Sequence, residues 1–106
     1  MKIKALEKSV LINLENIISG WTVTENNQIT KKFNFNNFRT GLEFVNIVGD
    51  LAESLNHHPE ITLNWKNVTI LTSTHQINSL SELDIELARR IDNSFNKFND
   101  LKGQNS

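Results

Sequence analysis

The hydrophobic residues of this chain recur with two different periods, and the alternation of these periods restricts the fold more than any other feature. Between residues 38 and 56 the apolar side chains follow at helical spacing: Leu42, Val45, Val48, Leu51, Ala52 and Leu55. The chain's only proline, Pro59, comes shortly afterwards. Because a proline displaces the preceding residue from the helical region, we expect this helix to end before Pro59.

Two further segments have the helical period. In the first, over residues 5–19, Leu6, Val10, Leu14 and Ile17 share a face, and Gly20 follows as a candidate C-cap. The second begins at the sequence Ser81-Glu-Leu-Asp84, which is typical of a helix N-cap with an acid three residues later. Apolar residues then continue at helical spacing as Leu87, Ala88, Ile91, Phe95 and Phe98.

The remaining segments alternate with a period of two, which predicts strands. Residues 22–24 and 29–35 flank a turn signal at Asn26-Asn27 and predict one β-hairpin. Residues 63–65 and 68–75 flank a tight turn expected at Lys66-Asn67. In the last strand Val68, Ile70, Thr72 and Thr74 would share one face, with Leu71, Ser73 and His75 on the other.

This order of elements predicts a fold class. Helix, strand, strand, helix, strand, strand and helix follow one another with short connections. The economical architecture is α+β, a four-stranded antiparallel sheet with three helices packed on one face. The chain has 106 residues, so we expect one domain over residues 1–106.

The composition limits the function. The formal net charge is −1, which gives no electrostatic case for binding nucleic acid or an anionic membrane directly. No apolar run approaches the roughly 20 residues that span a bilayer. The amino-terminal apolar stretch is interrupted by Glu7 and Glu15, so it is a better amphipathic helix than a signal peptide. Cysteine is absent, and we expect a cytoplasmic protein.

The three histidines are the candidate chemical groups. His57 and His58 follow a predicted helix, and His75 ends a predicted strand. Histidine exchanges protons near neutral pH, so a shared site would suit acid–base catalysis. Alternatively, the pair is a solvated loop feature and His75 a strand-end residue bonded to water. The three segments meet only if the fold brings them together.

Other chemistries fit the sequence less well. Three imidazoles can bind zinc, but the helical His-x-x-x-His spacing is missing, and we expect no metal. Ser54 and Ser73 lie near histidines without the Gly-x-Ser-x-Gly motif of a nucleophilic serine. The four glycines are scattered, which argues against a phosphate-binding loop. Acid–base chemistry without a cofactor remains.

A set of motifs with fixed spacing runs through the second half of the chain. His57-His58-Pro59 precedes Trp65, then Thr74-His75, then Asp84. With this spacing, the segment 56–88 resembles the pterin-4a-carbinolamine dehydratases. Similar residues occur upstream, so the likeness covers nearly the whole chain: Gly20-Trp21, Phe33, Phe35, Phe38 and Ala52-Glu53. Where many relatives have an aspartate before the histidine pair, this chain has Asn56.

The resemblance implies an activity and a site. The family removes water from a 4a-hydroxytetrahydropterin, giving the quinonoid dihydropterin in tetrahydrobiopterin recycling, and needs no cofactor. By this resemblance the catalytic residues would be His57, His58 and His75, with His75 acting at the departing hydroxyl. The substrate-binding residues would be Glu53, Asn56, Pro59, Trp65, Ser73, Thr74, Gln76 and Asp84. Trp65 fits a core or interface role equally well, and Asp84 fits an ordinary helix N-terminal acid.

The resemblance also implies assembly, because family members form dimers or tetramers. We expect a homodimer or homotetramer with a pterin as its small-molecule substrate. One alternative is a non-catalytic interaction protein, such as a dimerisation cofactor or an assembly chaperone, with a protein partner that the sequence does not identify. Another is an enzyme of a different pterin pathway, such as molybdopterin metabolism.

Overall fold

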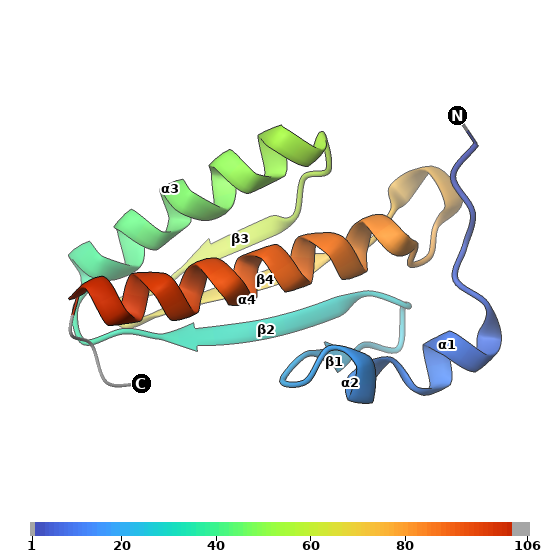
Figure 1. Cartoon of the computed structure of the whole chain (residues 1–106), viewed down its shortest axis with the longest axis horizontal. Helices are drawn as coiled ribbons and strands as arrows, with labels where there is room; N and C mark the ends of the chain where they lie inside the picture. The colour runs from blue at the N-terminus through green and yellow to red at the C-terminus, as the bar shows by residue number, and fades with distance from the viewer. Residues whose placement is uncertain (1, 103–106) are drawn as a thin grey trace.

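The computed structural model describes residues 2–102, and Figure 1 shows their arrangement. Two short helices and a β-hairpin are followed by a long helix, a second hairpin, a 3-10 turn and a last long helix. The elements are α1 (Lys8–Ile12), α2 (Leu14–Ile17), β1 (Thr22–Val23), β2 (Ile29–Asn34), α3 (Phe38–Leu55), β3 (Glu60–Leu63), β4 (Asn67–Thr72), η1 (His75–Ile77) and α4 (Glu82–Lys102).

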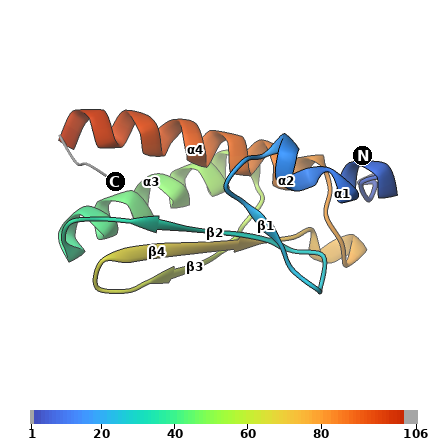
Figure 2. The same ribbon diagram turned by 90° about the horizontal axis from the view of Figure 1, so that it is seen from below.

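The four strands form one antiparallel sheet in the order β1-β2-β4-β3. The two hairpins join through β2 and β4, with Lys31 opposite Ile70 in the register. Figure 2 shows α1, α2, α3 and α4 on the same face of this sheet. The predicted α+β class and the four-stranded antiparallel sheet are therefore confirmed. In the described part of the chain, no helix is long and apolar enough to cross a membrane.

The predicted number of three α-helices is wrong, because the first segment forms two short helices. The break is at Asn13, whose φ of −100° and ψ of 7° depart from helical values. Its backbone N–H donates to the carbonyl of Val10 at 3.1 Å, and its side-chain amide donates to the carbonyl of Ser9 at 3.0 Å. Asparagine competes in this way with regular helical hydrogen bonds, so the apolar period continues while the helix does not.

The core lies between the helices and the sheet and is rich in aromatic residues. Phe33 of β2 contacts Phe44 of α3 and Phe95 of α4, with ring centroids 5.2 and 4.9 Å apart. Phe33 and Phe44 are almost completely buried. Large buried aromatic side chains dominate core energetics, and these rings connect both long helices to the sheet. They fix where the end of α3 and the start of α4 lie.

The second hairpin differs from the prediction in its first strand and in its turn. Strand β3 covers Glu60–Leu63 instead of residues 63–65, because the extended backbone begins directly after Pro59. Asn64 and Asn67 face each other, with the Asn64 N–H donating to the Asn67 carbonyl at 2.8 Å, so the turn is Trp65-Lys66. Strand β4 then ends at Thr72, and His75 begins η1 instead of continuing the strand. The predicted faces are correct within these limits: Val68, Ile70, Thr72 and Thr74 are all buried.

Candidate active site

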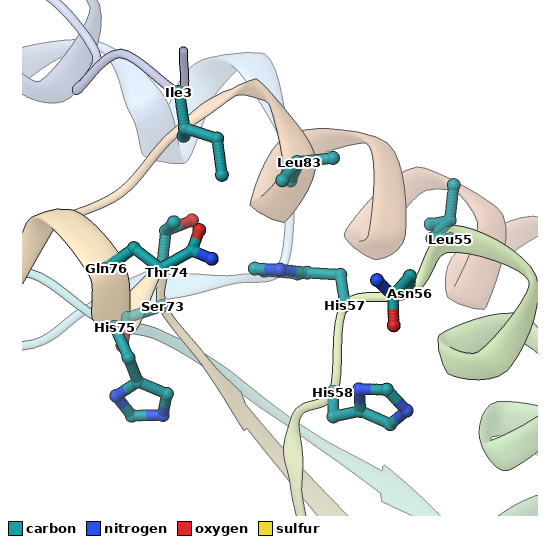
Figure 3. Close-up of a pocket in the computed structure, with 10 residues that line it drawn as sticks. All are labelled: Ile3, Leu55, Asn56, His57, His58, Ser73, Thr74, His75, Gln76 and Leu83. Carbon is teal, nitrogen blue, oxygen red and sulfur yellow. The ribbon is translucent and has the colours of Figure 1, made fainter. Parts of the chain in front are cut away.

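A cavity of about 400 Å³ lies where the end of α3, the end of β4, η1 and the start of α4 meet. This volume is within the range of roughly 300–1,000 Å³ that is usual for small-molecule sites. All three histidines line it, as Figure 3 shows. The lining residues are Ile3, Leu55, Asn56, His57, His58, Ser73, Thr74, His75, Gln76 and Leu83.

Asn56 determines how the two adjacent histidines leave helix α3. It takes a left-handed conformation, with φ 49° and ψ 43°, which asparagine tolerates better than most residues. The N–H of His57 then donates to the carbonyl of Ala52 at 3.0 Å and closes the helix. The two histidines reach different environments: His57 is 8% exposed, whereas the His58 side chain is 56% exposed.

Asp84 lies behind His57 and accepts hydrogen bonds at both carboxylate oxygens. Its Oδ1 is 2.6 Å from His57 Nε2 and accepts from the Thr72 hydroxyl at 2.9 Å. Its Oδ2 accepts from the Thr74 hydroxyl at 2.8 Å and from the backbone N–H of Ser81 at 3.0 Å. Asp84 is fully buried. A buried carboxylate is tolerated in a protein when it is satisfied in this way.

The same aspartate caps helix α4. The N–H of Ser81 donates to Asp84, and the Ser81 hydroxyl accepts from the N–H of Leu83 at 3.2 Å, which is the arrangement of a capping box. The predicted N-cap at Ser81–Asp84 is therefore confirmed. Asp84 therefore is the helix N-terminal acid that the sequence suggested, and the same side chain also contacts His57.

The contact with Asp84 assigns the proton on the His57 ring. A carboxylate accepts hydrogen bonds and donates none, so Nε2 must carry the proton in this pair. In the neutral ring the other nitrogen, Nδ1, then has a free lone pair. Because His57 lines the cavity, Nδ1 is the nitrogen available to a ligand there.

His58 and His75 lie at the more open part of the cavity. The Nε2 atom of His58 contacts Oε2 of Glu53, and both side chains are largely exposed. His75 is exposed at the start of η1, where a bridge between Thr74 and Ser79 bends the chain after β4. Exposed imidazoles can exchange protons with solvent, whereas the buried His57 is held in one orientation.

The structure brings most of the predicted site residues together, and leaves some outside the cavity. Asn56, Ser73, Thr74 and Gln76 line it beside the three histidines. Glu53 is at the rim through His58, and Asp84 is behind His57. Pro59 is not a lining residue, and Trp65 is in the β3–β4 turn with 72% of its surface exposed. In this chain Trp65 is neither a cavity wall nor a core residue.

Several cavity and supporting residues were missed by sequence reasoning. Leu55 and Leu83 are lining residues that the helical patterns contained without indicating a site. Ile3 comes from the amino-terminal segment, which the N–H of Leu6 joins to the carbonyl of Leu80 at 2.9 Å. No local signal predicts this contact. The sequence places Thr72 on the same strand face as Val68 and Ile70, and a hydroxyl among apolar side chains is a signal for a buried polar partner.

The described residues do not form a metal site. Across residues 2–102, no group of three or more histidine, aspartate or glutamate side chains is placed to hold a metal ion. His57 and His58 each have a carboxylate partner, and these partners belong to different elements. The imidazoles that line the cavity are groups that can donate and accept protons.

Comparison with known proteins defines the class to which this fold and cavity belong. Residues 4–94 match the family model described as "Pterin 4 alpha carbinolamine dehydratase". The chain is 40% identical over 87 residues to a relative from Rubrobacter xylanophilus whose name places it in this family, covering 82% of this chain and 81% of the relative. A relative of the same name from Sulfurisphaera tokodaii is 36% identical over 89 residues, covering 84% and 94%. The chain thus belongs to the pterin-4a-carbinolamine dehydratase family.

Solved structures show the same architecture. A crystal structure titled as a transcriptional coactivator/pterin dehydratase from Brucella melitensis superposes with a TM-score of 0.79 at 31% identity, covering 87% of this chain and 98% of that one. A pterin dehydratase-like protein, described as a RuBisCO assembly factor of the alpha-carboxysome, gives a TM-score of 0.60 at 20% identity, covering 72% and 89%. The second likeness shows the fold alone.

Proposed function

We propose that this protein is a 4a-hydroxytetrahydropterin dehydratase that uses its histidines as general acids and bases in tetrahydrobiopterin recycling. The observation that carries this proposal is the placement of three imidazoles on one cavity, with His57 oriented by the buried Asp84. Family membership supports the choice of a pterin substrate.

The reaction requires two proton transfers. The C4a–O bond breaks and the hydroxyl leaves as water, while N5 loses its proton and a double bond forms between N5 and C4a. No electrons are gained or lost, so groups that donate and accept protons are sufficient. We assign His75 to the departing hydroxyl, because it is exposed and can be reprotonated from solvent. His57 and His58 would assist proton transfer and hold the ring.

Polar side chains around the histidines suit a pterin, whose ring edge both donates and accepts hydrogen bonds. Asn56, Ser73, Thr74 and Gln76 provide such groups on the cavity wall. Leu55 and Leu83 supply apolar surface for the faces of the ring. We propose that these residues bind the substrate.

The test is the dehydration rate of enzymatically generated 4a-hydroxytetrahydropterin, with the uncatalysed rate subtracted. Wild type should accelerate the reaction, and His75→Ala should lose roughly 10²-fold or more of the acceleration, which is the usual contribution of a general acid or base. Gln76→Ala is a matched neighbouring control, and we expect mainly a higher KM from it. Full activity in a folded His75→Ala protein would refute the assignment of His75.

A role in protein interaction is a second candidate. The Brucella melitensis relative is titled as both a coactivator and a pterin dehydratase. Helix α3 exposes Phe38 and Leu42, which are 46% and 42% exposed. A variant with all three histidines replaced should fail to restore function in cells lacking the protein if catalysis is the role. Full complementation by that variant would favour the interaction role.

The exposed apolar residues of α3 also support the expected homodimer or homotetramer. A second copy would cover Phe38 and Leu42, as symmetric oligomers commonly do with such surfaces. Light scattering at micromolar concentration should give at least the dimer mass. A monomer under these conditions would refute this expectation.

A further inference from the structure

Thr72 lies outside the cavity lining and contacts both members of the His57–Asp84 pair. It is the last residue of β4 and only 2% exposed. Its hydroxyl oxygen is 2.9 Å from Asp84 Oδ1 and 3.4 Å from His57 Nε2. The strand thus presents a polar group between the imidazole and the carboxylate, at a position where an apolar side chain would otherwise face the core.

The hydroxyl has one proton, and the geometry determines where that proton goes. Asp84 has only lone pairs to offer, so the Thr72 proton points to Oδ1. Toward His57 the hydroxyl oxygen therefore presents its lone pairs. A ring with the proton on Nε2 satisfies both Oδ1 and the Thr72 oxygen. A ring with the proton on Nδ1 would turn its Nε2 lone pair against two acceptors, which is repulsive.

The rest of the network prevents Asp84 from turning away. Its Oδ2 is held by the Thr74 hydroxyl and by the Ser81 backbone N–H. The Thr74 hydroxyl donates its one proton to Asp84. The Ser81 hydroxyl is therefore the donor in the 2.7 Å hydrogen bond between Ser81 and Thr74. With Oδ2 fixed by these groups, the position of Oδ1 depends on Thr72 and His57.

We propose that Thr72 is a positioning residue that holds His57 in the Nε2–H tautomer, leaving Nδ1 free to take part in proton transfer at the cavity. The inference rests on the proposed dehydratase function for its catalytic consequence. Thr72 acts through Asp84 and His57, because it does not line the cavity itself.

The kinetic test removes the hydroxyl while keeping the shape of the side chain. For Thr72→Val we expect kcat to fall about 10-fold, because only the molecules with an unprotonated Nδ1 could take part in proton transfer there. KM should change less than about twofold, because no cavity contact is removed. Thr72→Ser should restore kcat to within about threefold of wild type. Thr69→Val is the matched control, since Thr69 lies in the same strand with its side chain on the opposite face from Thr72.

The spectroscopic test reads the tautomer directly from the ¹⁵N chemical shifts of the His57 ring. Wild type, Thr72→Ser and Thr69→Val should show a single species protonated at Nε2. Thr72→Val should show a mixture of the two tautomers, because Asp84 Oδ1 then loses the hydroxyl that holds it beside His57 Nε2. If Thr72→Val does not fold, Thr72→Ala is the second hydroxyl-free variant, with the same expected result.

Two outcomes would overturn the proposal: a hydroxyl-free variant that keeps the pure Nε2–H tautomer, or one that keeps the wild-type kcat. If wild type proves to have no dehydratase activity, the proposed function fails, and the ring shifts alone decide the role of Thr72. The two failures are therefore distinguishable.

Discussion

Residues 2–102 contain two imidazole–carboxylate pairs whose surroundings differ sharply. His57 and Asp84 are buried, with side chains 9% and 0% exposed, and hydroxyl and backbone donors complete the hydrogen bonding of the carboxylate. His58 and Glu53 are 56% and 75% exposed at the rim. Because solvent screens the second pair and competes for its hydrogen bonds, only the first can fix a ring in one orientation. The same two functional groups thus give a rigid support in one place and an adjustable contact in the other.

The largest effect should come from removing the centre of the buried pair. Asp84→Ala leaves His57, Thr72, Thr74 and the Ser81 N–H without their acceptor. Leaving buried donors without a partner costs about 1–3 kcal/mol each, so with partial relaxation the loss should be about 3–5 kcal/mol in all. We expect a decrease of that size in the free energy of unfolding, measured in urea, together with loss of the dehydratase rate. Glu82→Ala, an exposed acid in the first turn of the same helix, is the control and should change stability by less than about 1 kcal/mol. Equal effects of the two substitutions would contradict the central role of Asp84.

The second comparison replaces the two adjacent histidines one at a time. His57→Ala removes a donor from a buried carboxylate and should lower the free energy of unfolding by about 1–3 kcal/mol. His58→Ala removes an exposed partner and should change it by less than about 0.5 kcal/mol. Dehydration rates measured with the same two proteins should fall roughly 10²-fold or more for His57→Ala. A His58→Ala protein that is the less stable of the two would show that the contrast between the pairs is wrong.

A smaller effect is expected at the exposed pair itself. Glu53→Gln keeps the shape of the side chain and removes its charge. We expect a change in stability below about 0.5 kcal/mol, and that difference should disappear in 1 M salt, where the screening length is only about 3 Å. Urea titrations of wild type and variant at low and high salt provide the measurement. A change that persists at high salt would indicate that this pair is shielded from solvent, for example by a second copy of the chain.

The smallest effect should follow from Trp65→Ala. This side chain is 72% exposed, lies in the β3–β4 turn and does not line the cavity. We expect the stability of the monomer to change by less than about 0.5 kcal/mol, as is usual for exposed positions, with an unchanged dehydration rate. Rates and thermal melts of dilute protein would test this. A large loss of activity would indicate that Trp65 reaches the site of a neighbouring copy in the oligomer, and would support the predicted role of Trp65 in substrate binding.

Periodicity predicted the fold well where a pattern was long. The helix expected over residues 38–56 is found at Phe38–Leu55, because its apolar face is regular and Asn56 and Pro59 end it. The first helix failed because one residue, Asn13, satisfies its hydrogen bonds locally. The turn expected at Lys66-Asn67 lies one residue earlier, at Trp65-Lys66. A pattern of period two does not determine which residues form the turn and which pair between the strands.

The cavity histidines were predictable because they occur in recognisable motifs, His57-His58-Pro59 and Thr74-His75. The buried residues that hold His57 in place were harder to predict. Thr72 and Asp84 are 12 residues apart in sequence and meet only through the packing of α4 on the sheet. The contribution of Ile3 depends on where the amino-terminal segment crosses the start of α4, a long-range contact that no local pattern encodes. A sequence read in windows detects groups that are chemically unusual, while their buried partners look like ordinary strand and helix residues.

The two carboxylate oxygens of Asp84 bind different parts of the molecule, and this has a consequence for how the protein unfolds. One oxygen caps helix α4 through the Ser81 amide, and the other holds His57. Any opening of the first turn of α4 therefore releases the His57 imidazole as well, so the exchange of the Ser81 amide hydrogen with deuterium reports the fraction of molecules in which the His57–Asp84 contact is intact. During folding, the contact of His57 with Asp84 and Thr72 can form only after α4 has docked onto β4, so it should follow that docking and not the formation of the helices.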